Sequence, residues 1–337
     1  MGSEEPRSAG PPSMQLMRLL WPGAMAVQAI HVAAKLGVAD LVAGGPKTVL
    51  ELAEATRTDR PSLERLLRAL TSLGIFVEDP QGRYCQTELS DALRTDHPQS
   101  MRPLAMMLGA GFVWRPSGEL DVTIRTGQPA FEHVYGAQFF KHLASHPDEA
   151  AVFNAAMSSM PVYITAIVDA YDFSKFERIV DIGGGHGALL VGILTANPRV
   201  HGVLHDLPEV AAGVSVPSNV ADRLEIVAGD FFEAVPAAAD AYLLKGIIHD
   251  WDDASAATIL KNCRRAIRPD GRLFIVDTVL IPSSDPASAL MDMLMMVLTR
   301  GRERTESEFR SLLREADFSL VNVIPTARHS ILESRPI

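Results

Sequence analysis

The sequence predicts an α/β protein in which a mostly helical front domain precedes a domain built on a parallel sheet. Up to about residue 172, apolar residues recur at spacings of three and four, which is typical of amphipathic helices. Beyond that point, short β-branched runs alternate with amphipathic segments, which favours βαβ units. A glycine-rich turn directly follows the first of these runs. At 337 residues, the chain is also longer than one typical domain.

Composition excludes several classes of function. With 47% hydrophobic and 21% charged residues, the chain can bury a large core and is expected to be globular. A net charge of -10 argues against a protein that mainly neutralises phosphates, so nucleic acid is not expected as a partner. Cys85 and Cys263 fall in different predicted domains and form no Cys/His cluster. Neither a disulfide framework nor a structural zinc site is therefore expected.

The amino-terminal residues 1–13 are rich in Pro, Gly, Ser and Glu. We expect a disordered tail there, because the segment lacks the apolar core of a secretory signal. The most apolar early stretch, Leu19 to Val42, is interrupted by Gln28, His31, Lys35 and Asp40. Such polar interruptions are unfavourable in a membrane span. The sequence therefore predicts a cytoplasmic protein without a membrane partner.

Residues 14–100 have the pattern of a winged helix. Thr48 and Glu51 form a capping box, and Asp59 before a proline marks the start of the next helix. After Gly74, two short runs flank an Asp-Pro-Gln-Gly turn and predict a hairpin. Helix, turn, helix and hairpin together predict a winged-helix arrangement.

Two functions are open for this winged helix: DNA binding, and packing or dimerisation. DNA binding needs an excess of positive charge on the elements that approach the phosphates. The segment from Thr48 to Leu73 carries four arginines and four acidic residues, so this excess is missing. The sequence therefore favours a helical domain used for packing or dimerisation.

Residues 101–172 are expected to form bridging helices. They contain an aromatic and methionine stripe that includes Trp114, Phe153, Met157 and Met160. Such a stripe is usually core. It becomes the wall of a substrate pocket only if it lies beside a catalytic domain.

Residues 173–337 are expected to form the sheet domain. Strands spaced by helices imply right-handed crossovers and a parallel sheet. The tail adds two runs without an intervening helix, which predicts two closing strands. The predicted strands are Arg178 to Ile182, Val200 to His205, Leu224 to Ala228, Ala241 to Lys245, Arg272 to Val279, Ser319 to Pro325 and Ser330 to Glu333.

The segment from Val180 to Ala188 runs from the first strand through four glycines into a helix. Glycines such as Gly183 and Gly185 let the backbone approach a ligand closely, and the free N–H groups of the helix start attract polar or anionic groups. Gly183, Gly185 and Ala188 also match a dinucleotide fingerprint. The turn by itself therefore leaves the choice between cofactors open.

Acidic residues at later strand ends narrow that choice. Asp206, which precedes Leu207, ends the second strand, where a carboxylate can accept hydrogen bonds from both hydroxyls of a ribose. Asp230 ends the third strand and could face an adenine amino group, with Phe231 against the ring. Each carboxylate could equally be an ordinary solvated loop residue. Both, however, fall at the carboxyl edge of a parallel sheet, where ligands bind.

The fourth strand ends at Lys245 and is followed by the run His249-Asp250-Trp251-Asp252-Asp253. The histidine offers a possible base. A histidine among aspartates can also indicate a metal site. Sequential residues of a loop seldom converge on one ion, however, and no second histidine is near in sequence. The sequence therefore predicts no metal.

These motifs together resemble the class I S-adenosylmethionine-dependent O-methyltransferases of small molecules, such as plant caffeate-type and bacterial polyketide-tailoring enzymes. The resemblance covers nearly all of the chain from Met14 to Ile337. DIGGGHG, HDLPEV, GDFF, LLKGIIHDWDD and GRERTESEF occur in the family's order. It implies a Rossmann-like methyltransferase domain behind a winged-helix dimerisation domain, and hence a homodimer. It also implies S-adenosyl-L-methionine as cofactor, S-adenosyl-L-homocysteine as its product, and a small aromatic substrate.

The resemblance also implies site residues. Those expected at the cofactor are Gly183, Gly185, Asp206, Leu207, Asp230, Phe231 and Lys245. His249 is implied as the base, flanked by Asp277 at the end of the fifth strand and by Glu303. Expected on the substrate side are Trp114, Phe153, Met157 and Met160, the last at a position where plant members commonly have a histidine.

Methyl transfer from a sulfonium is an in-line displacement, which needs an acceptor oxygen more nucleophilic than a neutral hydroxyl. A phenol titrates near ~10 and an imidazole near ~6.5, so complete proton transfer to His249 would be uphill by roughly 5 kcal/mol. A carboxylate such as Glu303 or Asp277 at the other ring nitrogen would reduce that gap. The expected acceptor is a phenolic hydroxyl of a bacterial aromatic secondary metabolite.

Three other functions stay open. A nicotinamide-dependent reductase shares the glycine turn but gives no reason for Asp230 or for the motif at His249. A non-catalytic winged-helix regulator that senses a nucleoside would bind duplex DNA, which an acidic front domain disfavours. A methyltransferase scaffold redirected to another reaction on an aromatic substrate is the third, and the intact His249, Asp277 and Glu303 argue against it.

Overall fold

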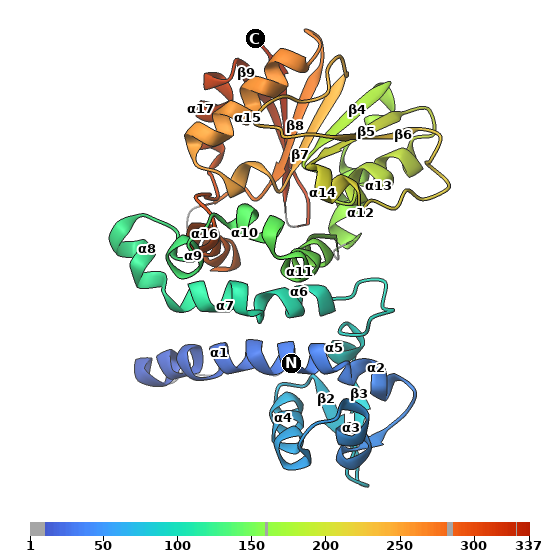
Figure 1. The fold of residues 1–337 in the computed structure, drawn as a ribbon, viewed down its shortest axis with the longest axis vertical. Coiled ribbons are helices and arrows are strands. Elements are labelled where there is room, and N and C mark those ends of the chain that lie inside the picture. The colour runs from blue at the N-terminus through green and yellow to red at the C-terminus, as the bar shows by residue number, and fades with distance from the viewer. Residues whose placement is uncertain (1–10, 159–160, 282–285, 328) are drawn as a thin grey trace, which may run out of the picture. The chain divides into compact units, whose positions relative to one another are not determined.

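The computed structural model describes residues 11–158, 161–281, 286–327 and 329–337. By the contacts within the chain, the protein divides into two compact units, Met1–Gly111 and Phe112–Ile337. Figure 1 labels the elements of both units. Each unit contains a hydrophobic core of its own.

The front unit is built mainly from helices and holds one small sheet. Its strands lie in the order β1-β3-β2, and neighbouring strands are antiparallel. The expected tail at residues 1–13 falls largely in residues 1–10, which lie outside the described residues. The elements are α1 (Pro12–Leu36), α2 (Val38–Ala43), β1 (Lys47–Thr48), α3 (Val49–Thr56), α4 (Arg60–Ser72), β2 (Phe76–Glu78), β3 (Arg83–Gln86), α5 (Glu88–Asp91) and α6 (Arg102–Leu108).

Local capping explains why the winged helix forms where the sequence predicts it. The Thr48 hydroxyl accepts the Glu51 N–H while the Glu51 carboxylate accepts that of Thr48, which confirms the capping box at the start of α3. The Asp59 carboxylate accepts the Ser62 N–H and starts α4. The predicted hairpin is β2 and β3. The short strand β1, which the sequence does not predict, adds a third strand to it.

Helix α6 belongs to the front unit, whereas the sequence assigns residues 101–172 to bridging helices. Arg102 Nε donates to the Ala34 carbonyl at the end of α1 (2.9 Å), and the same guanidinium pairs with Asp40 in α2 (3.2 Å). The bond from Arg102 satisfies a carbonyl at the C-terminus of α1, which is distant from α6 in the sequence. The division between the units therefore falls after Gly111 rather than after residue 100.

Helix α1 presents a row of apolar side chains that the single chain does not cover. By length and composition it could cross a membrane, and the bent pair Pro147–Ser158 and Tyr163–Ala170 passes the same test if taken as one span. Signal sequences and core helices of soluble proteins pass this test too. An exposed apolar row of this size marks an interaction surface. Its members are Met14, Leu16, Met17, Leu19, Leu20 and Met25.

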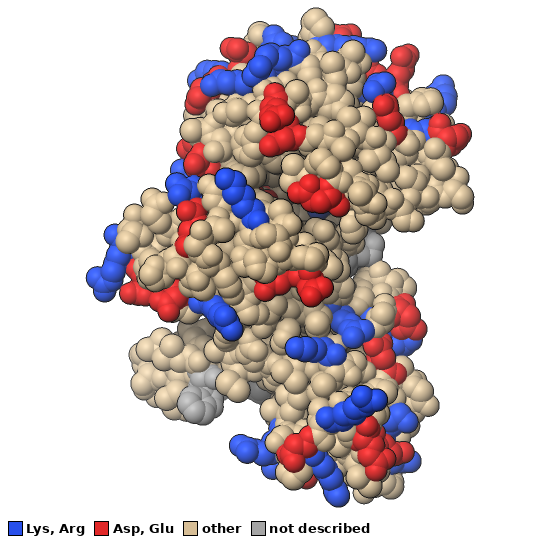
Figure 2. Space-filling model, in the orientation of Figure 1, with Lys and Arg blue, Asp and Glu red and all other residues tan. Residues whose placement is uncertain are grey.

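The surface charge of the front unit is mixed. In Figure 2, blue basic and red acidic side chains are interspersed over the displayed face. On α4, for example, Arg68 pairs with Glu64 one helical turn earlier (3.4 Å). This arrangement agrees with the balance of charge along the predicted winged helix.

The second unit begins with short helices and continues into the large sheet. The helices before the sheet are α7 (Gly111–Gly118), α8 (Leu120–Thr126), α9 (Ala130–Tyr135), α10 (Phe139–Ser145), α11 (Pro147–Ser158), α12 (Pro161–Ala170) and the 3-10 turn η1 (Phe173–Lys175). The strands are β4 (Arg178–Ile182), β5 (His201–Asp206), β6 (Leu224–Ala228), β7 (Ala241–Lys245), β8 (Arg272–Asp277), β9 (Phe318–Pro325) and β10 (Ser330–Pro336). The remaining helices are α13 (Ala188–Ala196), α14 (Pro208–Ala211), η2 (Ile248–Asp250), α15 (Asp253–Ala266), α16 (Pro286–Leu298) and α17 (Glu306–Glu315).

The large sheet has seven strands in the order β6-β5-β4-β7-β8-β10-β9. Strands β4 to β8 pair in parallel, and β10 runs antiparallel to both β8 and β9. All the predicted strands are present, including the two closing strands. The chain enters at the central strand β4, adds β5 and β6 on one side, and then returns to add β7 and β8 on the other. This reversal creates a topological switch point at the carboxyl ends of β4 and β7, where ligands bind in such folds.

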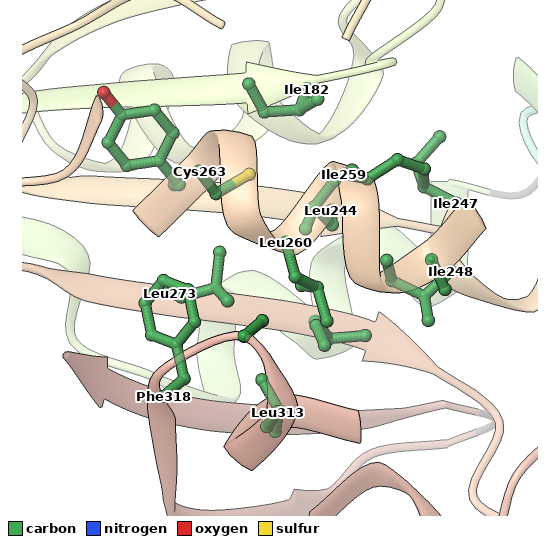
Figure 3. Close-up of a cluster of buried hydrophobic side chains, with 14 of the residues drawn as sticks. Ile182, Leu244, Ile247, Ile248, Ile259, Leu260, Cys263, Leu273, Leu313 and Phe318 are labelled. Atoms are coloured by element: carbon green, nitrogen blue, oxygen red, sulfur yellow. The ribbon is translucent and has the colours of Figure 1, made fainter. Parts of the chain in front are cut away.

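Helices cover both faces of the sheet and create a core on each (Figure 1). Alternating residues of β4 separate the two cores, because Val180 and Ile182 pack against α15 and α17 while Ile179 packs toward α13. Figure 3 shows Leu260 and Cys263 of α15 between strand residues such as Leu244 and Leu273. Helix α15 directly follows the His249 loop. The packing of α15 in this core therefore fixes the position of the carboxyl end of that loop.

We expect Leu260→Ala to lower the free energy of unfolding of the second unit by about 2 to 5 kcal/mol, because the side chain is fully buried and its removal leaves a cavity. Thr258→Ala, on the exposed face of the same helix, should change it by less than about 0.5 kcal/mol. Urea denaturation followed by circular dichroism measures both. Equal losses from the two variants would contradict the assigned core.

Candidate active site

The glycine turn after β4 brings the backbone close to its neighbours and leaves one open position. Gly183 has φ +64°, and a Cβ added there would lie 2.5 Å from the Ile247 side chain. Gly185 has φ +59°, yet a Cβ there would meet nothing within 4 Å. Only glycine is comfortable in this left-handed backbone. The turn therefore combines tight packing at Gly183 with free space at Gly185, on the side where a ligand could approach.

Asp206, at the end of β5, is tied to this turn. Its Oδ2 accepts the Gly185 N–H and its Oδ1 accepts the Leu207 N–H, both at 2.8 Å. Burial raises the pKa of the Asp206 carboxyl, although these two N–H bonds oppose the rise. Each carboxylate oxygen retains a further lone pair that can accept another hydrogen bond. The structure thus brings Gly185, Asp206 and Leu207 together.

Asp230 and Phe231 follow β6 and are held by a residue that sequence reasoning missed. The Phe232 N–H donates to Asp230 Oδ1 (2.8 Å). The buried Asn262 amide of α15 donates to the carbonyl oxygens of Phe231 (2.7 Å) and Phe232 (2.9 Å). The Phe231 ring stands edge-on to Trp251 at 6.1 Å. A lone asparagine on a helix gives no sequence signal for this role.

A carboxylate that was not predicted as a site residue, Asp181, lies under the glycine turn. Asp181 in β4 is buried, and a Cβ added to Gly184 would lie 2.6 Å from its Oδ2. Burial raises the pKa of Asp181 to about 7, against the opposing charge of Lys245 at the end of β7. Lys245 therefore lies within electrostatic reach of the turn.

His249 follows β7 in the 3-10 turn η2, and its imidazole is held by Glu303. The distance from His249 Nδ1 to Glu303 Oε1 is 3.0 Å, and the Glu303 side chain is fully buried. The second ring nitrogen, Nε2, lies 3.7 Å from Asp250 Oδ1. The structure thus joins two residues that are 54 positions apart in the sequence. A carboxylate at Nδ1 orients the ring and places a proton there, which leaves Nε2 for proton exchange.

The surroundings of His249 favour its charged form. Burial alone would lower the pKa of His249, but three carboxylates raise it to about 10. They belong to Asp277, Asp250 and Glu303. Opposite charges in a region of low dielectric stabilise the imidazolium strongly.

Asp277 and Asp250 differ from what the sequence predicts. Asp277 ends β8 as expected, but neither of its buried oxygens accepts a hydrogen bond from the described residues. It therefore acts on His249 through charge, and Glu303 alone supplies the predicted hydrogen bond. Burial raises the pKa of Asp277 to about 7 and that of Asp250 to about 6, each against the charge of His249. Asp250, directly after the histidine, was not predicted to take part.

The predicted substrate side of the site is an aromatic row that reaches the His249 loop. The Phe153 ring in α11 lies edge-on to Phe139 and Phe140 of α10, at 5.4 and 6.0 Å. Phe140 stacks on Trp251 at 5.5 Å. Trp251 also meets the Phe232 ring edge-on at 4.7 Å. One tryptophan thus contacts aromatic residues from both the bridging helices and the expected cofactor side.

The other expected substrate residues are less closely joined to this row. Trp114 in α7 is half-buried. Met157 in α11 is 42% exposed, so the single chain does not enclose it. Met160 lies outside the described residues. Within the part of the chain that the structure describes, no group of three or more His, Cys, Asp or Glu side chains is arranged to hold a metal ion.

The comparisons with known protein families and with known proteins all point to one family. A model described as an O-methyltransferase domain matches residues 118–319, and one described as an O-methyltransferase dimerisation domain matches residues 19–96. The chain is 41% identical over 341 residues to the phenazine O-methyltransferase PhzM of Lysobacter antibioticus. This match covers 99% of this chain and 100% of that protein.

Solved structures agree. The crystal structure of LaPhzM matches with a TM-score of 0.91 at 41% identity and covers 97% of this chain and 100% of that chain. NcsB1 from neocarzinostatin biosynthesis was solved with S-adenosyl-L-homocysteine and 1,4-dihydroxy-2-naphthoic acid. It matches with a TM-score of 0.81 at 34% identity, covering 95% of this chain and 98% of that chain. The predicted fold is confirmed. The chain belongs to the S-adenosylmethionine-dependent O-methyltransferase family and carries that family's dimerisation domain.

Proposed function

We propose that this enzyme methylates a phenolic hydroxyl of a small, flat aromatic natural product and that His249 is the general base. The observation that carries the proposal is the partly buried imidazole of His249, 19% exposed, held at Nδ1 by Glu303 and surrounded by carboxylates. The aromatic row of Phe140, Phe153 and Trp251 supports a flat aromatic acceptor. Two relatives, a phenazine O-methyltransferase and a protein solved with a dihydroxynaphthoic acid, point in the same direction.

The carboxyl edge of β4 to β7 fits S-adenosyl-L-methionine. Gly185 offers free space, and Asp206 retains acceptor capacity for ribose hydroxyls. When bound, the cofactor supplies a methyl group on a positively charged sulfur. The residues proposed to hold it are Gly183, Gly185, Asp206, Leu207, Asp230, Phe231 and Lys245.

The carboxylates around His249 address the energetic problem of deprotonating a phenol. An ordinary imidazole differs from a phenol by about 3.5 pKa units, or roughly 5 kcal/mol. The raised pKa of His249, about 10, makes the imidazole nearly as basic as a phenolate. Transfer of the phenolic proton to His249 is then close to balanced. Glu303 and Asp277 supply that basicity.

The same raised pKa sets the protonation state before the acceptor arrives. At neutral pH, a histidine with a pKa of about 10 is mostly imidazolium, with one proton on each ring nitrogen. Only the neutral fraction of His249 can therefore accept the phenolic proton. After that transfer, the phenolate lies beside an imidazolium.

We further assign the apolar row of α1 to a homodimer interface. Residues 19–96 match the dimerisation domain. Leu19, Leu20 and Met25 of the row lie within this range, and the other members immediately precede it. A second copy of the chain would remove Leu19, Leu20 and Met25 from water without any lipid. A cytoplasmic homodimer is the state proposed.

We expect Asp206→Asn to weaken binding of S-adenosyl-L-homocysteine by at least about tenfold, since the amide offers one acceptor oxygen where the carboxylate offers two. Isothermal titration calorimetry measures the affinity. Asp222→Asn, with an 80% exposed side chain, is the matched control and should bind like the wild type. An unchanged affinity in Asp206→Asn would remove this residue from the proposed cofactor site.

His249→Ala should lower kcat by about 10² to 10⁴, the usual contribution of general base catalysis, while S-adenosyl-L-homocysteine still binds. Transfer of tritium from methyl-labelled cofactor to 1,4-dihydroxy-2-naphthoic acid, used as a trial acceptor, provides the assay. Circular dichroism verifies that the variant is folded. Wild-type turnover in the variant would show that proximity suffices and the base is dispensable.

Asp277→Asn should make stability less dependent on pH. The pKa of Asp277 is about 7 in the folded protein and ordinarily 3.8, so the folded state retains a proton that the unfolded chain loses as pH rises. The protonated Asp277 carboxyl therefore contributes to the stability of the folded state fully below about pH 4, and this contribution disappears as the pH rises toward 7. From pH 4 to pH 6, wild-type unfolding free energy should fall by about 2 kcal/mol more than that of the variant.

Urea denaturation at the two pH values gives this difference. Asp270→Asn, at an exposed carboxylate, should follow the wild-type curve. Parallel curves for wild type and Asp277→Asn would show that the buried carboxyl does not titrate as assigned.

A further inference from the structure

The segment between α16 and α17 lies directly against the backbone of the His249 loop. A Cβ added to Gly301 would come within 2.5 Å of the carbonyl carbon of Asp250, and closer still to the carbonyl oxygen of His249. No side chain fits between the two segments at this point. The loop that carries the imidazole is thus packed backbone to backbone against Gly301.

Arg304, from the same segment, holds that loop on both sides of the histidine. Its guanidinium is fully buried. Nη1 donates to the carbonyl of Ile248 (2.9 Å) and Nη2 donates to the carbonyl of Trp251 (2.9 Å). Nε and Nη2 also donate to Asp253 Oδ1, at 2.9 and 2.7 Å. The two carbonyls bracket His249, so the guanidinium fixes the shape of η2.

Burial of this charge needs an explanation other than stability. Removing a guanidinium from water is costly, and the carboxylate that it pairs with here, Asp253, is 58% exposed. A well-packed apolar side chain often stabilises such a position as well or better. The planar fork of arginine, however, can donate in several fixed directions at once, which no apolar side chain and no lysine can do. The geometry is specific for holding the loop.

Arg304 and Glu303 act from one rigid strip of backbone. Arg304 forms a parallel bridge with Val279, just beyond the end of β8, and its carbonyl accepts the Leu280 N–H (2.9 Å). From these adjacent positions, the Glu303 carboxylate contacts the imidazole of His249 and the Arg304 guanidinium contacts the backbone of the same loop.

We infer that Arg304 is a positioning residue for methyl transfer: it sets the His249 imidazole against Glu303 and the Trp251 ring against Phe140. This inference rests on the proposed function, in which His249 is the base. It assigns to Arg304 no contact with substrate or cofactor. Its effect passes through the loop backbone from residue 248 to residue 251.

Arg304→Lys tests the inference, with Arg302→Lys as the matched control. Lysine preserves the charge but cannot donate to both carbonyls, so the loop loosens. We expect kcat for 1,4-dihydroxy-2-naphthoic acid to fall about 10- to 100-fold, as displacements near 1 Å can produce, with affinity for S-adenosyl-L-homocysteine within about twofold of wild type. Arg302, whose side chain is 40% exposed and pairs with Glu308 and, at 3.7 Å, with Asp253, donates to neither loop carbonyl that Arg304 holds, so lysine should leave kcat unchanged there.

A readout that needs no turnover separates the inference from the proposed function. The His249 imidazole can be titrated by NMR in histidine-labelled protein, with His249→Gln identifying its signal. In the wild type, the imidazole should titrate well above its ordinary range, and in Arg304→Lys its pKa should move back toward that range, because its contact with Glu303 is less fixed. Absence of methyl transfer from the wild type to every member of a panel of phenolic acceptors would refute the proposed function while leaving this titration to judge Arg304.

Two results would overturn the inference. The first is a folded Arg304→Lys with wild-type kcat, or with kcat and cofactor affinity reduced in proportion, which would indicate a general structural role. The second is a wild-type His249 that titrates at about 6.5, the ordinary value, which would show that the loop is not held against the carboxylates. The second result needs no variant, so it can overturn the inference even if Arg304→Lys does not fold.

Discussion

The contact between His249 Nδ1 and the buried carboxylate of Glu303 is the interaction on which the proposed chemistry of this protein depends. An imidazole removed from water tends to lose its proton, and a carboxylate removed from water tends to gain one. Placed together, each relieves the cost of burying the other. Asp277 and Asp250 add negative charge around the same ring and make it an unusually strong base.

The parallel sheet explains why this contact can exist. Strands β7 and β8 end at the same edge, so the His249 loop and Asp277 emerge side by side although helix α15 separates them in sequence. The glycine turn after β4 and Asp206 after β5 emerge at that edge too. One edge therefore holds the proposed base on one side of the switch point and the proposed cofactor-binding groups on the other.

The sequence predicted the fold more completely than the site. Runs such as Arg178–Ile182 have a period and composition that define a strand locally, and Thr48 with Glu51 defines a helix start. Glu303 was found through a family motif, because nothing local connects it with a histidine 54 positions away. Arg304 and Asn262 gave no signal: in sequence they resemble ordinary surface residues, and only tertiary packing buries them against backbone carbonyls.

The adjacency of Glu303 and Arg304 restricts how this enzyme can change in evolution. Deleting or inserting one amino acid between these residues and Gly301 would displace both side chains from the His249 loop, because Gly301 is packed against that loop and leaves no room for a shift. We therefore expect changes of length to be poorly tolerated here, even though the segment connects two helices, where gaps are ordinarily tolerated.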